Sequence, residues 1–194
     1  MVLPLSFYER PALTVAEQLI GCYLVRIIDG KRVVGKIVET EAYLGTNDRA
    51  AHTYSGRPTK RTEAMFGPAG RAYVYKMHTH HLLNVVTDEE GIPHGVLIRA
   101  VEPLDGIDTI KKNRHHVKRK IDWTNGPGKL TKAFHITMDF YNHRLDTSPL
   151  FIEKGERGLV EKSKRIGIKN SGEAAHYLWR FSEVDNPYVS KYRP

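Results

Sequence analysis

Two glutamates separated by a single residue are the clearest candidates for chemistry in this sequence. Glu39 and Glu41 lie in the segment 37–65, which continues into a long polar loop that contains His52 and several basic residues. Because side chains alternate between the two faces of an extended chain, Glu39, Glu41 and Tyr43 point to the same side. Two carboxylates on one face resemble the acid–base pair of a glycosidase. A solvated strand edge that prevents aggregation produces the same pattern.

The neighbouring residue types favour chemistry on a nucleobase. Tyr43 and Tyr75 offer aromatic faces for stacking, and the basic loop 57–61 offers cations for phosphates. Such a combination suits an enzyme that holds a base flipped out of a nucleic acid. Breaking an N-glycosidic bond builds positive charge on the sugar, so a nearby carboxylate can stabilise that charge and activate water.

Composition gives the chain a basic character. It has 194 residues, with 30 Lys and Arg against 22 Asp and Glu, for a formal net charge of +8. A surplus of this size favours polyanionic partners, because cations that contact phosphates release condensed counterions. It does not distinguish DNA from RNA, acidic lipid or heparin.

A single cysteine, Cys22, excludes a disulfide framework and a thiolate zinc cluster. Residues 1–13 lack the apolar stretch of a signal peptide, and no run approaches the length that spans a bilayer. We therefore expect a cytoplasmic protein without contact with membranes. We also expect no cofactor, and we take a monomer as the default state.

Hydrophobic periodicity and turn residues predict one compact α+β domain over residues 1–194, with a curved, largely antiparallel β-sheet and flanking helices. Few predicted helices are long enough to cross between parallel strands. Helices are predicted at 11–20, after 106 and from 129, and strands at 22–28, 32–40, 71–77, 82–87, 95–101, 149–153, 158–162 and 176–181.

Several motifs, in order, resemble one known family. They are VETEAYLG (38–45), AAH (50–52), the MFGPAG–AYVY run (65–75), LNVVT (83–87), VLIRAVEP (96–103), NGPGKL (125–130), RIGI (165–168) and NPYVSK (186–191). The chain is similar over nearly its whole length to the alkyladenine, or 3-methyladenine, DNA glycosylases, and looks like a bacterial member. The resemblance implies a monofunctional hydrolase of base excision repair that acts at the bacterial nucleoid. It also implies that the enzyme binds double-stranded DNA containing damaged purines and leaves an abasic site. The expected lesions are 3-methyladenine and 7-methylguanine, with hypoxanthine and ethenoadenine as further candidates.

The resemblance also implies roles for individual residues. Glu41 matches the general base that activates the attacking water, and Arg99 matches the arginine that helps to position it. Tyr43 and Tyr75 match the aromatics that sandwich the flipped base, and His52 matches a histidine of the same pocket.

Two further strand positions belong to the expected base pocket. Asn84 matches the asparagine whose amide clashes with the exocyclic amino group of normal guanine, and Leu97 matches a position near the DNA. From the residues alone, Leu97 and Tyr75 are more typical of core positions in a strand than of a binding pocket. Arg99 within an apolar strand is harder to explain structurally, because a buried guanidinium requires an anionic partner.

The segment 76–83 departs from the family. Relatives carry a tyrosine there that fills the gap left by the flipped base, whereas this chain reads KMHTHHLL and is one residue shorter. His78 is the first candidate for this wedge and Met77 the second, since apolar side chains and flat rings both serve that purpose. The histidines also suggest a metal site, but the run lacks zinc-protease spacing and contains no carboxylate, so we expect none.

Two other functions remain open at this point. The changed segment 76–83 is compatible with a binder of damaged DNA or of RNA that has lost efficient chemistry. A metal-dependent nuclease using Glu39, Glu41 and the histidines is the third hypothesis.

Overall fold

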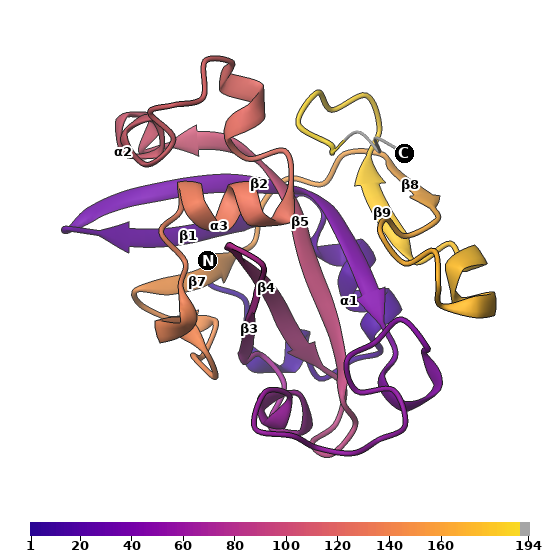
Figure 1. The fold of residues 1–194 in the computed structure, drawn as a ribbon. Helices are drawn as coiled ribbons and strands as arrows, with labels where there is room; N and C mark the ends of the chain where they lie inside the picture. Colours follow the sequence, from indigo (N-terminus) through magenta and orange to yellow (C-terminus); the bar gives the residue numbers. More distant parts are fainter. Residues whose placement is uncertain (191–194) are drawn as a thin grey trace.

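The protein, described by a computed structural model over residues 1–190, is built around one curved β-sheet (Figure 1). All paired strands within this range are antiparallel, and the order across the sheet is β3-β4-β5-β2-β1-β7-β6, with β9 pairing β2 and β8 pairing β9. The strands are β1 (Tyr23–Ile28), β2 (Lys31–Tyr43), β3 (Ala72–Met77), β4 (His80–Thr87), β5 (His94–Asp105), β6 (Asp146–Thr147), β7 (Leu150–Glu153), β8 (Val160–Ser163) and β9 (Arg180–Glu183).

Short helices flank this sheet. They are α1 (Ala12–Leu19), α2 (Ile107–Asn113) and α3 (Pro127–Ala133), with 3-10 turns at Leu5–Phe7, Gly45–Asn47, Glu63–Phe66, Lys120–Trp123, Met138–Phe140 and Gly172–His176. Helix α1 buries Val15, Ala16 and Leu19 at helical spacing. It ends before Gly21, whose φ of 90° suits a residue without a side chain.

The long strand β2 changes partners along its length, and this change creates the site. Its first half pairs with β1, whereas residues 39–41 pair with β9 on the same edge. Along its other edge, the register with β5 shifts between Ile37 and Glu39 and again between Glu39 and Thr40. Such bulges bend a strand and redirect its side chains. Glu39, Glu41 and Arg99 lie where the sheet is irregular.

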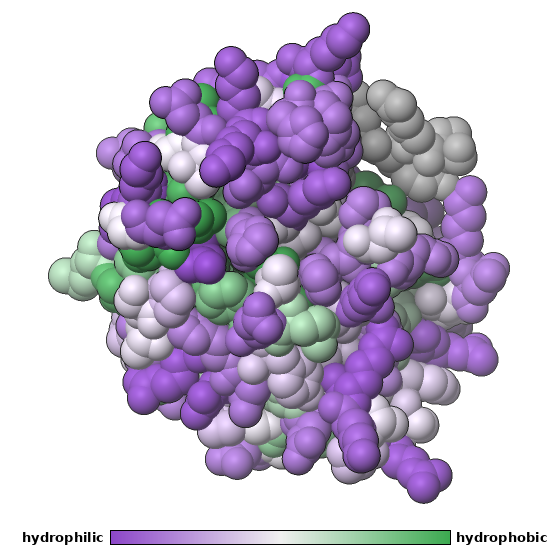
Figure 2. Space-filling view, turned by 60° about the vertical axis from the view of Figure 1, so that its left-hand side comes forward, coloured by the Kyte–Doolittle hydropathy of each residue, from purple (hydrophilic) through white to green (hydrophobic). Residues whose placement is uncertain are grey.

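One main core lies between the sheet and the helices. Close packing there explains Gly35 on β2, since a Cβ atom at this position would lie 2.7 Å from Val101 and 2.8 Å from Phe134. A separate, smaller cluster comprises Met65, Tyr73, Tyr75, Leu82, Val86 and Leu97. The surface in Figure 2 is largely hydrophilic, with hydrophobic residues in a few small areas.

The predicted α+β fold with a curved antiparallel sheet is confirmed. One strand prediction is wrong: most of 176–181 precedes β9, because residues 172–176 form a 3-10 turn and the strand begins at Arg180. Strand β2 runs on to Tyr43, three residues beyond its predicted end. The last four residues of the predicted domain 1–194 lie outside the described range. No helix within residues 1–190 is long and apolar enough to cross a membrane.

Candidate active site

The carboxylate of Glu41 is buried at the point where β2, β5 and β9 meet. Its Oε1 accepts a hydrogen bond from the backbone N–H of Ile166 at 2.7 Å, and its Oε2 accepts one from the hydroxyl of Tyr43 at 2.8 Å. Arg99 Nη1 lies 3.4 Å from Oε1. The side chain has no exposed surface. Glu41 is therefore held in one orientation by groups from three segments of the chain.

Glu39 occupies the same face of β2 but is fully engaged elsewhere. Its Oε1 accepts hydrogen bonds from Nε of Arg99 at 2.8 Å and from Nε of Arg180 at 2.7 Å. Both of its oxygens also bind Ser190, through the hydroxyl and the backbone N–H. Burial raises the pKa of Glu39, but the two arginines and Ser190 outweigh this effect and hold it below its usual value. Glu39 thus anchors Arg99 instead of facing the cavity.

Arg99 has the anionic partners that its buried position requires. Burial lowers the pKa of its guanidinium, but Glu41 and Glu39 together raise it above the ordinary value. The charge is therefore retained. Its Nε is fixed by Glu39, while Nη1 is directed at Glu41. Arg99 also lines the cavity, so one guanidinium contacts both carboxylates and the space beside them.

A fully buried ion pair between Asp48 and Arg165 packs against Tyr43, the residue whose hydroxyl binds Glu41. Arg165 donates to both oxygens of Asp48, at 2.5 and 2.8 Å, and to the carbonyl of Ala42 at 2.9 Å. Its guanidinium carbon also lies 4.7 Å above the ring of Tyr43. The pair thereby fixes the ring of Tyr43 and the segment that carries the N–H of Ile166.

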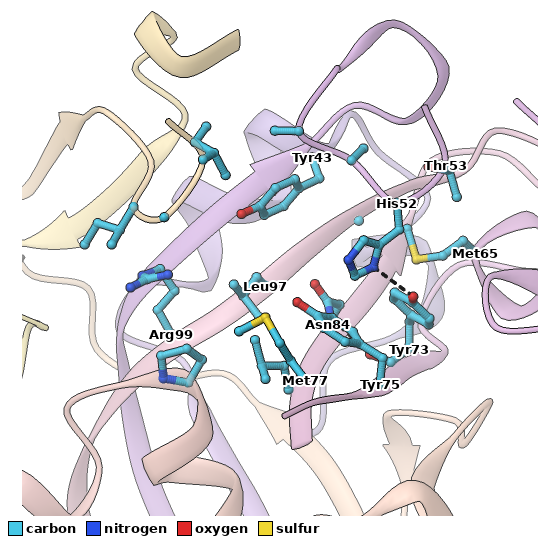
Figure 3. A pocket seen from close by; sticks show the side chains of 18 residues that line it. Tyr43, His52, Thr53, Met65, Tyr73, Tyr75, Met77, Asn84, Leu97 and Arg99 are labelled. Carbon is cyan, nitrogen blue, oxygen red and sulfur yellow. Dashed lines mark hydrogen bonds between the residues drawn. The ribbon is translucent and has the colours of Figure 1, made fainter. Parts of the chain in front are cut away.

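A cavity of about 370 Å³ lies beside Arg99, within the usual size range of small-molecule sites. Figure 3 shows Tyr43 at one side of it and Tyr73, Tyr75 and His52 at the other. The remaining lining includes Ala50, Ala51, Thr53, Met65, Met77, Leu82, Asn84, Gly95, Leu97, Pro127 and residues 166–168. Seven of the residues predicted from the sequence line this cavity: Tyr43, His52, Tyr75, Met77, Asn84, Leu97 and Arg99. Glu41 and His78 do not line it. Glu41 lies behind Tyr43 and Arg99, both of which contact its carboxylate.

The aromatic wall is held by hydrogen bonds and ring contacts. His52 Nδ1 lies 3.0 Å from the hydroxyl of Tyr73, and its ring meets that of Tyr75 edge-on at 4.5 Å. Tyr73 and Tyr75 stack with centroids 5.4 Å apart. Burial, reinforced by the charge of Arg61, lowers the pKa of His52 to about 4. His52 is therefore neutral at physiological pH.

Asn84 and Leu97 are neighbours across β4 and β5, and both line the cavity. The amide nitrogen of Asn84 donates to the backbone carbonyl of Tyr73 at 3.1 Å, which fixes the rotation of the amide. Leu97 is 3% exposed and belongs to the small apolar cluster. Leu97 therefore belongs both to the buried apolar cluster and to the lining of the cavity.

The segment 76–83 forms a tight hairpin between β3 and β4. Met77 pairs with His80, which leaves His78 and Thr79 as the turn, and His78 has a φ of 53°. Helix α3 supports this hairpin from behind, since a Cβ atom on Gly128 would lie 2.7 Å from His80. Met77 is 47% exposed and lines the cavity, whereas His78 is exposed at the tip.

Several residues of the site were not predicted. Tyr73 shares a face with Tyr75 by strand alternation, so the AYVY run held a signal for it. Ile166 and Arg165 come from a segment more than 120 residues away from Glu41, and their roles depend on the pairing of β9 with β2. Within residues 1–190, no group of three His, Cys, Asp or Glu side chains is placed to hold a metal ion.

A buried carboxylate lies beside an arginine and next to a cavity walled by tyrosines and a histidine. This arrangement is suited to acid–base chemistry on a flat ring. Comparisons with known proteins narrow this class of chemistry. The family model for methylpurine-DNA glycosylases (MPG) matches residues 6–187. The chain belongs to the methylpurine-DNA glycosylase family. It is therefore a hydrolase of DNA repair, a monofunctional DNA glycosylase whose substrate is DNA.

Individual relatives cover almost the same length. A protein of Bacillus licheniformis is 52% identical over 190 residues, and one of Bacillus subtilis is 51% identical over 190 residues. Each of these alignments spans 97% of this chain and 96% of the relative. A protein of Clostridium acetobutylicum is 45% identical, with 95% of both chains covered. All three carry the name "Putative 3-methyladenine DNA glycosylase".

Proposed function

We propose that this enzyme flips an alkylated purine nucleotide out of double-stranded DNA and hydrolyses its N-glycosidic bond, with Glu41 as the general base. The observation that carries this proposal is the fixed carboxylate of Glu41 beside Arg99 and the aromatic cavity. A carboxylate offers about four acceptor sites, of which Ile166 and Tyr43 take two. In the structure the carboxylate has no exposed surface, and Nη1 of Arg99 lies 3.4 Å from Oε1. The proposal therefore requires that Oε2 become accessible to water when the substrate is bound.

In the proposed reaction, the oxygen of water attacks C1′ of the sugar while Glu41 accepts one of its protons. The bond between C1′ and the purine nitrogen breaks, and its electron pair leaves with the base. A purine methylated at N3 or N7 carries a positive charge and departs as a neutral molecule. The negative charge of Glu41 also stabilises the positive charge that builds up on the sugar in the transition state. Arg99 orients Glu41 and the water through its Nη1.

The walls of the cavity supply recognition of the base. Tyr43, Tyr75 and His52 bind its faces by stacking, and Leu97 closes the floor. The amide of Asn84, held by the carbonyl of Tyr73, excludes the exocyclic amino group of normal guanine. On this basis, 3-methyladenine and 7-methylguanine are the principal lesions, and hypoxanthine and ethenoadenine are further candidates.

The β3–β4 hairpin is the proposed wedge that enters the duplex. His78 at its tip is the first candidate to fill the gap left by the flipped base, and Met77 at the rim of the cavity is the second. The rigid backing of this hairpin by α3 suits such a role, because a wedge must keep its position while the base is held outside the helix.

A duplex containing methylated purines tests the proposal directly. Free methylated base, released in EDTA from an otherwise intact strand, is the expected product. Binding without release would favour the non-catalytic binder, and strand cleavage that EDTA abolishes would favour the nuclease. Trapping of a covalent protein–DNA adduct with borohydride would contradict direct attack by water.

A further inference from the structure

Arg61, His52 and Tyr73 form a chain of hydrogen bonds beside the cavity. The direction of each bond is fixed because a guanidinium can only donate. Arg61, from the basic loop, places Nη2 3.2 Å from Nε2 of His52. On the other side of the imidazole, Nδ1 lies 3.0 Å from the hydroxyl of Tyr73. The guanidinium of Arg61 also lies 5.0 Å above the ring of Tyr75.

The first link determines the tautomer of His52. A guanidinium has only donors, so Nε2 of His52 must present its lone pair to Arg61. Burial and the charge of Arg61 lower the pKa of His52 to about 4, so the neutral ring carries its one proton on Nδ1. The titratable or charged groups that contact this ring are Arg61 from the loop and Tyr73 and Tyr75 from β3.

The second link determines the orientation of the Tyr73 hydroxyl. With its proton on Nδ1, His52 donates to the oxygen of Tyr73, and the hydroxyl must direct its own proton elsewhere. Burial raises the pKa of Tyr73 to about 12, although the charge of Arg61 and its direct hydrogen bond to the phenol act in the opposite direction. The phenol therefore keeps its proton, and Arg61, like His52, donates to its oxygen. Stacking on Tyr75 and an edge contact with Tyr141 at 6.3 Å fix the ring, and Tyr73 lines the cavity.

We propose that Arg61 and His52 are positioning residues that make the hydroxyl of Tyr73 a hydrogen-bond donor to the acceptor edge of the bound purine, and that this donor selects for uncharged lesions. The selection rests on the proposed function. A neutral purine such as hypoxanthine gains negative charge on its ring nitrogens and O6 as the glycosidic bond breaks, and an O–H donor stabilises that charge. A base methylated at N7 departs uncharged and gains little from the same donor.

The tautomer can be measured without any substrate. In protein labelled with ¹⁵N-histidine, with the His52 signals assigned by their loss in His52→Asn, we expect the proton of neutral His52 on Nδ1. Arg61→Met should move the proton toward Nε2 and raise the pKa of His52, whereas Arg61→Lys should preserve the wild-type state. Arg57→Met, in the same exposed loop, is the matched control and should change neither. A wild-type His52 protonated on Nε2, or an unchanged tautomer in Arg61→Met, would overturn the donor chain.

Selection among lesions is measured as the ratio of single-turnover rates on hypoxanthine and on 7-methylguanine in the same duplex. Tyr73→Phe should lower this ratio about tenfold, the effect of one hydrogen bond, and Arg61→Met should lower it in the same direction. An unchanged ratio in Tyr73→Phe would overturn the selection. If the wild-type protein releases neither base, the proposed function fails and the selection fails with it. The tautomer measurement still tests the donor chain in that case.

Discussion

Replacing Glu41 by glutamine separates its chemistry from its role in packing. The amide is almost isosteric with the carboxylate, and the surrounding contacts determine its orientation. The N–H of Ile166 requires an acceptor, so the amide oxygen stays at the position of Oε1. The amide nitrogen then faces Tyr43, whose hydroxyl oxygen can accept its hydrogen bond. The variant therefore keeps both contacts and loses only the charge that faces Arg99.

The magnitudes of the two effects follow from these contacts. Weakening the charge-assisted interactions with Arg99 and Ile166 should cost about 1–3 kcal/mol of folding free energy. Removing a general base slows a reaction by about 10²–10⁴-fold. Loss of the negative charge near the sugar slows the reaction further. We therefore expect base release to be at least roughly 10³-fold slower, which corresponds to a loss of about 4 kcal/mol of transition-state stabilisation. Affinity for damaged DNA should change by less than about threefold, or roughly 0.6 kcal/mol.

Release of 7-methylguanine under single-turnover conditions measures the rate, and fluorescence anisotropy of the same duplex measures affinity. Glu102→Gln is the matched control, because Glu102 is a partly exposed carboxylate of β5 that pairs with Lys36 at 3.4 Å. It should release base at the wild-type rate. Near-normal release by Glu41→Gln would refute the mechanism, and loss of release in Glu39→Gln alone would assign the chemistry to Glu39.

Three further perturbations test the surrounding structure. Asp48→Asn leaves Arg165 as an unpaired buried charge, so we expect the free energy of unfolding to fall by about 3–5 kcal/mol. For a chain of this size, calorimetry should then show a Tm lower by roughly 6–20 °C. A Tm within about 2 °C of wild type would contradict a stabilising role for the pair. Binding to undamaged duplex should weaken with salt, and the slope of log binding constant against log salt concentration should correspond to about four or more phosphate contacts. Replacing residues 118–120 together by alanine should lower this slope. An unchanged slope would place the DNA-binding surface elsewhere. With a fluorescent base analogue opposite the lesion, His78→Ala should reduce the flipped fraction several-fold and His78→Tyr should restore it. A defect in Met77→Ala alone would assign the wedge to Met77, and normal flipping in both alanine variants would show that the hairpin does not enter DNA.

The sequence by itself determined the fold class and the common face of Glu39, Glu41 and Tyr43, because these features depend on local periodicity. The other expected site residues came from the resemblance to a known family. Alternation along β2 was sufficient to place Glu39, Glu41 and Tyr43 on one face, and the structure confirms this through the shared contacts with Arg99 and Glu41. Burial of an arginine within an apolar strand predicted an anionic partner for Arg99. Alternation along β3 also places Tyr73 on the same face as Tyr75, so the sequence held the information that Tyr73 belongs to the cavity.

Only the tertiary structure decided which of the two glutamates contacts Tyr43 in the wall of the cavity. The two residues have the same spacing and type, and their difference arises from long-range partners. Arg180 and Ser190 surround Glu39, whereas the N–H of Ile166 leaves Glu41 beside the aromatic wall. These partners come from segments more than 120 residues later in the chain. They are brought in because β9 pairs with β2 just beyond the residues that pair with β1. Contacts at such separation have no local periodicity, so no pattern in the sequence predicts them.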